Sequence, residues 1–283
     1  MDLQSYEQLV KSESTAKKYV LGFCWKNHQR FCPRCTSRRL YSLLDARRRC
    51  ARCGYTFHDR TGRWINTGSL THGQWLRLVK LFELEVSTRK AATQLGLTYK
   101  TVYKAIATLR LAILAHAPDG GQFLSGEIEL DEAYFGGRRK GKRGRGAAGK
   151  VPVFGILERD GQVSVSVVPN VRAETLLDLT VKKVRRGSIV YTDKYQVYDA
   201  LMFCGYRHLK IDHGTHFAQG RVSINGLEGF WSYAKERLAK HHGVSPQRFP
   251  LYLKELEFRY NHRQEDIFPR LVQYLCDFVP NLT

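Results

Sequence analysis

The 283 residues are enough for two or three domains, and hydrophobic residues make up 43% of them, so the chain can build buried cores. No run approaches eighteen apolar residues and the first residues lack a signal-peptide pattern, so we expect neither a membrane span nor export. Lys and Arg number 46 against 26 Asp and Glu, a formal net charge of +20, which predicts a polyanionic partner and most simply a nucleic acid.

Two cysteine pairs follow a short helical lead-in and define the first predicted domain, residues 1–62. Each pair has the form Cys-x2-Cys, and fourteen residues separate them. Two such turns can close a tetrahedral site for zinc. Because sulfur fills all four positions, we expect one structural Zn²⁺ that takes no part in catalysis. Its ligands would be Cys32, Cys35, Cys50 and Cys53. Nearby arginines would offset the thiolate charge or contact phosphates; they are Arg34, Arg38, Arg39, Arg47, Arg48, Arg49 and Arg52.

Residues 63–118 form the second predicted domain, and the segment 87–104 within it fits a helix-turn-helix. Gly96 would make the turn and Thr98 would cap the second helix, which Val102 anchors. The exposed start of a recognition helix is where DNA is contacted. We therefore expect DNA contacts from Tyr99, Lys100, Thr101 and Lys104. A three-helix bundle without DNA contact is the alternative.

The hydrophobic period changes after residues 118–121, Pro-Asp-Gly-Gly. Residues 127–131 alternate strictly, as a half-buried strand does, and two more strands are expected at 153–157 and 163–168. A helix, a strand, a second helix, a short strand and further helices follow. This order predicts a mixed sheet flanked by helices, in the α/β class, for the third domain, residues 119–283.

Three acidic residues stand where elements of this domain end or begin. Asp131 ends the alternating strand, Asp193 follows an apolar strand, and Glu228 lies near the start of a helix. Carboxylates from neighbouring strands and a helix can hold two Mg²⁺ ions for displacement at phosphorus. Each residue alone has an ordinary structural explanation, and only the set predicts a metal site.

These motifs resemble those of the DDE transposases of bacterial insertion sequences, in particular the ISXO-like branch, which also has an N-terminal zinc ribbon. The motifs are Leu-Asp131-Glu-Ala-Tyr-Phe-Gly-Gly, Tyr-Thr-Asp193, and Asn225-Gly-Leu-Glu228-Gly-Phe-Trp followed by Lys235. The resemblance covers about residues 30–265. It implies an RNase-H-like fold, two Mg²⁺ or Mn²⁺ ions per active site, and cutting and joining of transposon-end DNA. The catalytic residues it implies are Asp131, Asp193, Glu228 and Lys235.

The third metal ligand has two candidates. Members of this branch can present Asn at that position, and Asn225 lies one helical turn before Glu228 on the same face. A carboxylate binds Mg²⁺ better than an amide does, so we favour Glu228. Lys235 shares the face and is expected to contact a phosphate near the scissile bond, with a plain surface lysine as the alternative.

A basic segment lies between the first two strands of the third domain. It has seven basic residues and no acidic one, and its glycines suit it to follow phosphates. A solvated loop is the alternative. The predicted DNA contacts are Arg138, Arg139, Lys140, Lys142, Arg143, Arg145 and Lys150.

Together these patterns predict a DNA transposase that acts on double-stranded DNA, both transposon ends and target. Two ends must be paired, so a homodimer or a larger synaptic complex is expected, in the bacterial cytoplasm at the nucleoid and away from membranes. One alternative is a stand-alone, structure-selective nuclease of the same fold. Another is a zinc-ribbon and helix-turn-helix transcription regulator, which would need neither the acidic set nor the basic segment.

Overall fold

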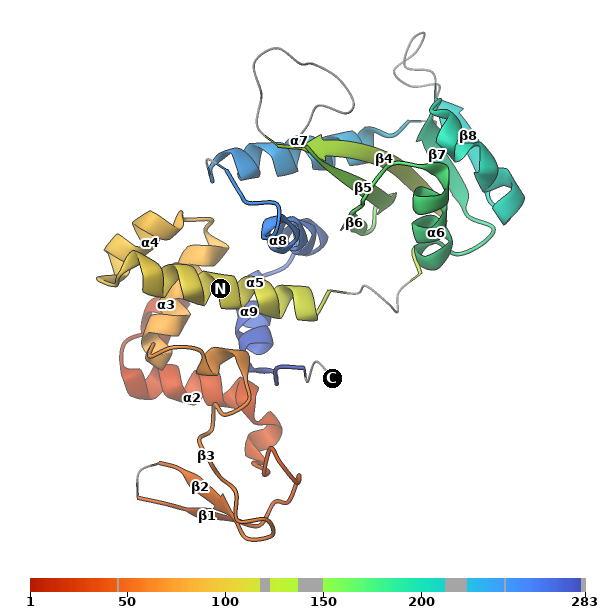
Figure 1. The fold of residues 1–283 in the computed structure, drawn as a ribbon. Coiled ribbons are helices and arrows are strands. Elements are labelled where there is room, and N and C mark those ends of the chain that lie inside the picture. The colour runs from red at the N-terminus through yellow and green to blue at the C-terminus, as the bar shows by residue number, and fades with distance from the viewer. Residues whose placement is uncertain (45, 118–122, 137–149, 212–222, 242, 281–283) are drawn as a thin grey trace. The chain divides into compact units, whose positions relative to one another are not determined.

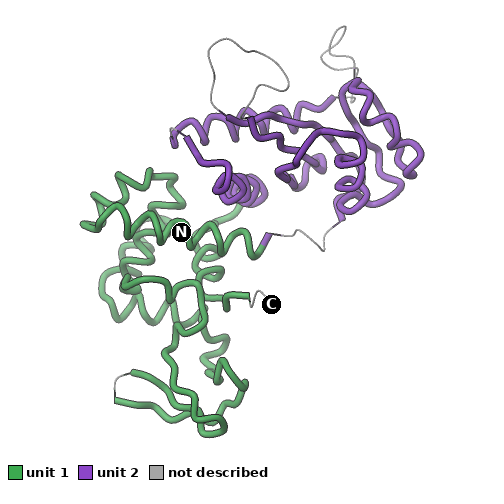
Figure 2. Tube along the Cα trace, viewed as in Figure 1, with its two compact units in different colours: residues 1–116, 264–283 green, residues 117–263 purple. Residues whose placement is uncertain are grey.

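The computed structural model describes the chain except residues 45, 118–122, 137–149, 212–222, 242 and 281–283. It forms two compact units, residues 1–116 with 264–283 and residues 117–263 (Figure 2). The catalytic domain expected from the sequence extends to residue 283, whereas the structure groups residues 264–283 with the first unit. The reason is the last helix, α9 (Ile267–Cys276), whose apolar side is fully buried there through Phe268, Leu271 and Leu275.

The first unit begins with helices and a small antiparallel sheet of three strands in sequence order. The elements are α1 (Leu3–Leu9), α2 (Glu13–Cys24), η1 (Lys26–His28), β1 (Leu40–Ser42), β2 (Arg48–Cys50) and β3 (Thr56–Phe57). A short turn of helix and three longer helices follow, and α9 packs against α2, α3 and α5. These are η2 (Trp64–Asn66), α3 (His72–Glu83), α4 (Thr88–Leu95) and α5 (Tyr99–Ala115).

Local signals set the borders of α4 and α5. The Ser87 hydroxyl accepts a hydrogen bond from the backbone N–H of Lys90, which caps α4. Gly96 ends α4 with a left-handed φ of 62°. The Thr98 hydroxyl then accepts from the N–H of Thr101 at 3.2 Å and starts α5. The predicted turn and cap are therefore confirmed.

The second unit is built on a mixed sheet of five strands in the order β6-β5-β4-β7-β8 (Figure 1). The first three strands pair antiparallel, whereas β4–β7 and β7–β8 pair parallel. The strands are β4 (Glu127–Phe135), β5 (Val151–Glu158), β6 (Val163–Val167), β7 (Ile189–Asp193) and β8 (Arg207–Ile211). The helices are α6 (Ala173–Lys183), η3 (Gln196–Cys204), α7 (Asn225–Ala239) and α8 (Phe249–Asn261).

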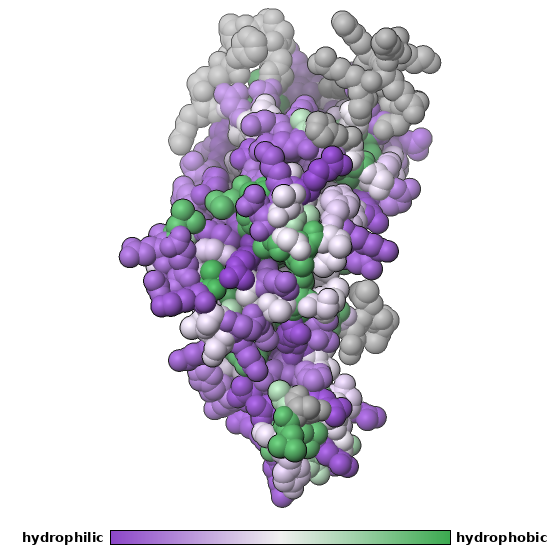
Figure 3. Space-filling view, turned by 90° about the vertical axis from the view of Figure 1, so that its left-hand side faces the viewer, coloured by the Kyte–Doolittle hydropathy of each residue, from purple (hydrophilic) through white to green (hydrophobic). Residues whose placement is uncertain are grey.

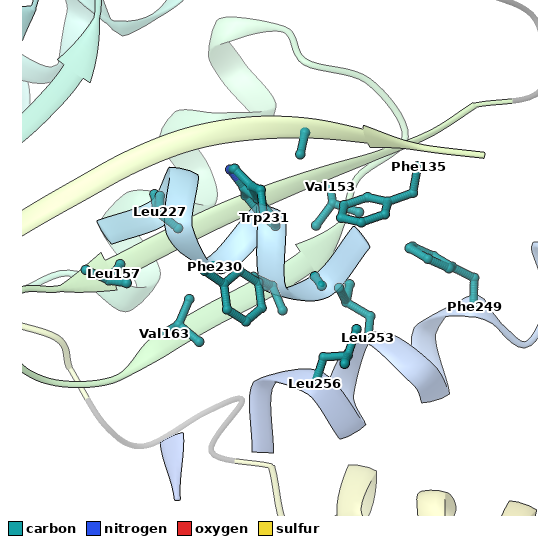
Figure 4. Close-up of a cluster of buried hydrophobic side chains, with 13 residues drawn as sticks. Phe135, Val153, Leu157, Val163, Leu227, Phe230, Trp231, Phe249, Leu253 and Leu256 are labelled. Carbon is teal, nitrogen blue, oxygen red and sulfur yellow. The ribbon is translucent and has the colours of Figure 1, made fainter. Parts of the chain in front are cut away.

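Both faces of this sheet are covered, because successive residues of a strand point to opposite sides. Ala133 and Phe135 of β4 pack with side chains of α7 and α8 (Figure 4). Ile128 and Leu130 pack on the other face with residues of α6 and η3. The predicted mixed sheet flanked by helices is confirmed.

The edge strand β6 is covered by side chains of α8. Asn261 accepts a hydrogen bond from the backbone N–H of Val163 at 2.8 Å and donates one to its carbonyl at 2.9 Å. Glu257 accepts from the N–H of Val165 at 2.7 Å. Main-chain groups on the outer side of β6 therefore have partners, as buried backbone groups require.

None of the described helices combines the length and the apolar content that a membrane crossing would need. The face in Figure 3 is mostly hydrophilic.

Candidate active site and metal centre

The two cysteine pairs of the first unit lie together. The four Sγ atoms lie within 4.8 Å of one another, with 3.6 Å from Cys32 to Cys53 and 3.5 Å from Cys35 to Cys50. Each pair stands on a tight turn, in which Thr36 donates its N–H to the Cys32 carbonyl and Gly54 does the same to Cys50. Four sulfur donors at this separation suit a tetrahedral Zn²⁺ and leave no position for a substrate.

The arginines around the cysteines differ in their surroundings. Arg48 and Arg30 both donate to Oδ1 of Asp59, at 3.2 and 3.1 Å, so Arg48 holds the ribbon to the segment after it. The other arginines named from the sequence are all exposed, namely Arg34, Arg38, Arg39, Arg47, Arg49 and Arg52. Contact with phosphate is therefore open to these residues sterically, while Arg48 is engaged within the unit.

Asp131 of β4 lies under α7, on the face of the sheet that this helix covers. The indole N–H of Trp231 in α7 donates to Oδ2 of Asp131 at 2.9 Å. Trp231 comes this close because the register partner of Asp131 on β5 is Gly155. A Cβ atom at Gly155 would lie 2.6 Å from the indole ring, which no side chain tolerates. The pair Gly155 and Trp231 thus fixes one oxygen of Asp131.

The surroundings of Asp131 disfavour the ionised form of its carboxyl group. Burial raises its pKa to about 7, and the negative charges of Glu132 and Asp193 act in the same direction. Asp193 ends β7, which runs parallel beside β4, and each acid lies two residues past the register pair Glu129 and Tyr191. Contrary to the prediction from the sequence pattern, Asp131 does not end its strand but lies in the middle of β4, which continues to Phe135. The backbone N–H of Tyr195 donates to Oδ1 of Asp193 at 2.9 Å. A bound cation would offset the repulsion between these two neighbouring carboxylates.

Glu132 points the other way, as strand alternation predicts. The Tyr198 hydroxyl of η3 donates to its Oε2 at 2.8 Å, on the far face of the sheet. Glu132 therefore influences Asp131 through its charge and not through a shared ligand position.

Helix α7 presents the remaining predicted residues to solvent. Asn225, Glu228 and Lys235 are all exposed, whereas Trp231, one turn after Glu228, is buried. In the described part of the chain, the cysteines form the only group of three or more possible metal-ligand residues within 4.8 Å of one another. The three carboxylates are thus not gathered to that distance, although Asp131 and Asp193 are close enough to affect each other.

The start of α5 carries the predicted DNA contacts. Tyr99, Lys100 and Lys104 are exposed, and the Tyr99 ring stacks on Tyr103 at 5.8 Å between centroids. Thr101 is half-buried and its hydroxyl lies 2.9 Å from that of Thr98, so the helix cap engages it. Residues 138–149 of the basic segment lie outside the described residues, and only Lys150 of that set is described, half-buried just before β5.

Two side chains of this region have contacts that the sequence pattern does not indicate. The indole N–H of Trp231 holds Asp131, although an apolar ring on a helix suggests only a core residue. Arg159, next to the Asp-Gly turn between β5 and β6, pairs with Glu127 and Glu129 on β4. The position of Trp231, one helical turn after Glu228, could have indicated that it lies near the acidic residues. Nothing in the turn sequence indicates the ion pairs of Arg159.

Comparison with known proteins gives matches over both units. Residues 123–261 match a family model described as an ISXO2-like transposase domain, and residues 11–56 match one described as a transposase zinc-ribbon domain. A protein of Haemophilus influenzae, described as an uncharacterized transposase-like protein, is 45% identical over 103 residues, which are 36% of this chain and 84% of that protein.

A protein of Halobacterium salinarum, described as an uncharacterized protein in transposable element ISH50, is 29% identical over 273 residues, 88% of this chain and 90% of the relative. Among solved structures, a simian T-cell lymphotropic virus intasome in complex with PP2A regulatory subunit B56 gamma matches at 15% identity. That match covers 73% of this chain and 76% of the other, with a TM-score of 0.33.

Proposed function

The chain is a DNA transposase of the ISXO2-like family, and from this premise we propose that Asp131, Asp193 and Glu228 form its active site. The proposed reaction is metal-dependent cleavage at transposon ends followed by joining to target DNA. The observation that carries the proposal is the half-buried Asp131 carboxylate under α7, whose pKa is raised to about 7, first by desolvation and further by the charges of Glu132 and Asp193. A buried carboxylate with a raised pKa costs stability and is kept where a function needs it.

The donor set fits divalent ions with oxygen preference, Mg²⁺ or Mn²⁺. Asp131, Asp193 and Glu228 would hold two such ions, which would supply activation of the attacking hydroxyl and stabilisation of the leaving oxygen. In this proposal Trp231 fixes the rotamer of Asp131 through its hydrogen bond. Glu228 supplies the third carboxylate from α7, and Lys235, two turns later, contacts a phosphate of the DNA.

The remaining assignments complete the proposal. Cys32, Cys35, Cys50 and Cys53 hold one structural Zn²⁺. The start of α5 and the basic segment bind DNA, with Thr101 acting mainly as part of the helix cap. Two ends must meet in one complex, so the working form is a homodimer or larger, at the bacterial nucleoid.

The direct test uses labelled DNA that carries the terminal repeats of the element around the reading frame. The wild-type protein should nick the end and join it to target DNA with Mg²⁺ or Mn²⁺, and should do neither when both ions are left out of the buffer. Binding of the end without these ions should persist, because the structural zinc stays in place when no chelator is added. Joining that proceeds without divalent metal would contradict the proposal, as would end binding with no cleavage under any metal, which is the behaviour of a regulator.

A second prediction separates Glu228 from Asn225. Glu228→Gln should lose joining by about a hundredfold, because an amide adds no charge against the ions, while Asn225→Ala should lose about tenfold or less. Joining rates at several Mg²⁺ concentrations measure both effects. Glu236→Gln is the matched control, because it makes the same change at an exposed glutamate of the same helix. An inactive Asn225→Ala beside an active Glu228→Gln would reverse the assignment.

A further inference from the structure

Helix α7 begins without a capping side chain of its own. Ile224 stands at the N-cap position, and no side chain within the helix's own segment bonds its first N–H groups. Unpaired N–H groups at a helix start normally need an acceptor. Here the acceptor comes from the sheet, since Oε2 of Glu129 on β4 receives the backbone N–H of Leu227 at 2.9 Å.

Burial of the Glu129 carboxylate beneath the start of α7 costs desolvation free energy. Its side chain is only 3% exposed, and a buried carboxylate is tolerated only with partners. The positive end of the helix dipole is one favourable partner. Gly226 makes the approach possible, because a Cβ atom at that position would lie 2.9 Å from Oε2 of Glu129 and 2.9 Å from Leu157.

Arg159 supplies the second partner and links the sheet to the segment that enters α7. Its Nε donates to Oε1 of Glu129 at 3.0 Å, and its guanidinium donates to Oε2 of Glu127 at 2.7 Å. The same guanidinium donates to the carbonyl of Ser223, two residues before the helix. It also lies over the Tyr191 ring, 3.8 Å from the centroid. One side chain thus contacts β4, β7 and the start of α7.

The geometry points to Glu129 and Arg159 as positioning residues of the active site. Glu129 lies two residues before Asp131 on the same face of β4, and its bond to Leu227 is adjacent to Glu228. The pair therefore ties the strand that carries one proposed ligand to the helix turn that carries another. This inference rests on the proposed function, because it assigns to the pair the alignment of Glu228 with Asp131 and Asp193.

The test compares Glu129→Gln, Arg159→Met and Arg159→Lys with the wild type. Glu129→Gln keeps the size and one acceptor, but it loses the ion pair. We expect joining at saturating DNA to fall about tenfold or more in Glu129→Gln and Arg159→Met, with more Mg²⁺ needed for half-maximal rate and unchanged DNA affinity. Arg159→Lys should fall between, because an ammonium cannot reach all three acceptors at once.

Glu255→Gln is the control for simple loss of a buried ion pair. Glu255 pairs with Arg259 at 2.9 Å within α8, so the change is chemically the same, but the pair belongs to a helix other than α7. Hydrogen exchange supplies a readout independent of activity, since the first-turn amides of α7 should exchange faster in Glu129→Gln and not in Glu255→Gln. The positioning role would be overturned if Glu129→Gln joined DNA and exchanged its α7 amide hydrogens at wild-type rates. It would also be overturned if Glu255→Gln lost as much joining activity as Glu129→Gln.

The two hypotheses fail differently. A wild-type protein without metal-dependent joining would refute the proposed function. An active wild type, with joining lost in Asp131→Asn but intact in Glu129→Gln and Arg159→Met, would refute only the positioning role.

Discussion

Asp131→Asn and Asp193→Asn are each expected to reduce cleavage and joining by about a thousandfold, since loss of a metal-ligating charge removes several kcal/mol of transition-state stabilisation. Binding of the transposon end should stay near wild type, because the helix-turn-helix and the zinc ribbon lie in the other unit. Rates with labelled ends at equal Mg²⁺, together with affinities measured without added Mg²⁺ or Mn²⁺, check both statements.

The matched control is Asp178→Asn on α6. Asp178 forms an exposed ion pair with Lys182, and such pairs contribute little to stability. The control should cleave and join at the wild-type rate. Near-wild-type joining by either active-site variant would refute the assignment of the site.

Asp131→Asn should also change the free energy of unfolding, and this effect can be measured independently of catalysis. The folded-state pKa of Asp131 is about 7, above its ordinary value of 3.8, so ionisation in the fold costs free energy at pH above 4. The free energy of unfolding therefore falls by about 1.4 kcal/mol for each pH unit between these two pKa values, and the loss is complete above pH 7. Without divalent metal, the variant should be more stable than the wild type at pH 8 and equal to it below pH 4. Denaturant melts at the two pH values measure the difference.

Removal of one zinc ligand should cause loss of the metal and unfolding of the zinc ribbon. Cys32→Ser deletes a fully buried thiol of the four-cysteine group, and the free energy of structural zinc binding is about 10–16 kcal/mol in small modules. The variant should lose its zinc and become open to proteolysis within residues 31–60. Metal analysis and limited digestion measure these two outcomes.

Cys204→Ser is the control for this experiment, because Cys204 is a half-buried thiol of the second unit outside the cysteine cluster. It should keep about one zinc per chain. Purified wild-type protein with a folded ribbon and no zinc would contradict the structural role of the metal.

Short-range signals predicted much of the fold. Thr98 and Gly96 define the helix-turn-helix because caps and left-handed turns depend on a few neighbouring residues. The alternation around Asp131 correctly placed the start of β4 and sent Glu132 to the opposite face, but β4 continues to Phe135 and is buried on both faces, so the predicted strand end and half-burial were wrong. Cysteine spacing is a similar case, since two short turns carry all four thiols.

Contacts between residues far apart in sequence could not be predicted in this way. Trp231 reaches Asp131 only because Gly155, on another strand, leaves room for its ring. Arg159 acts through partners 30 or more residues away, and α9 joins the first unit through an apolar face that would suit many surfaces. Periodicity identifies such a face but does not name what covers it.

The side chains of α8 that cover β6 affect whether two copies of the protein can associate through this strand edge. An open strand edge offers rows of donors and acceptors to any passing chain, and edge-to-edge pairing is a common route to aggregation. On β6, Asn261 and Glu257 already occupy main-chain groups of Val163 and Val165. A foreign strand must displace them before it can bind, so this side of the sheet resists the growth of intermolecular β-structure.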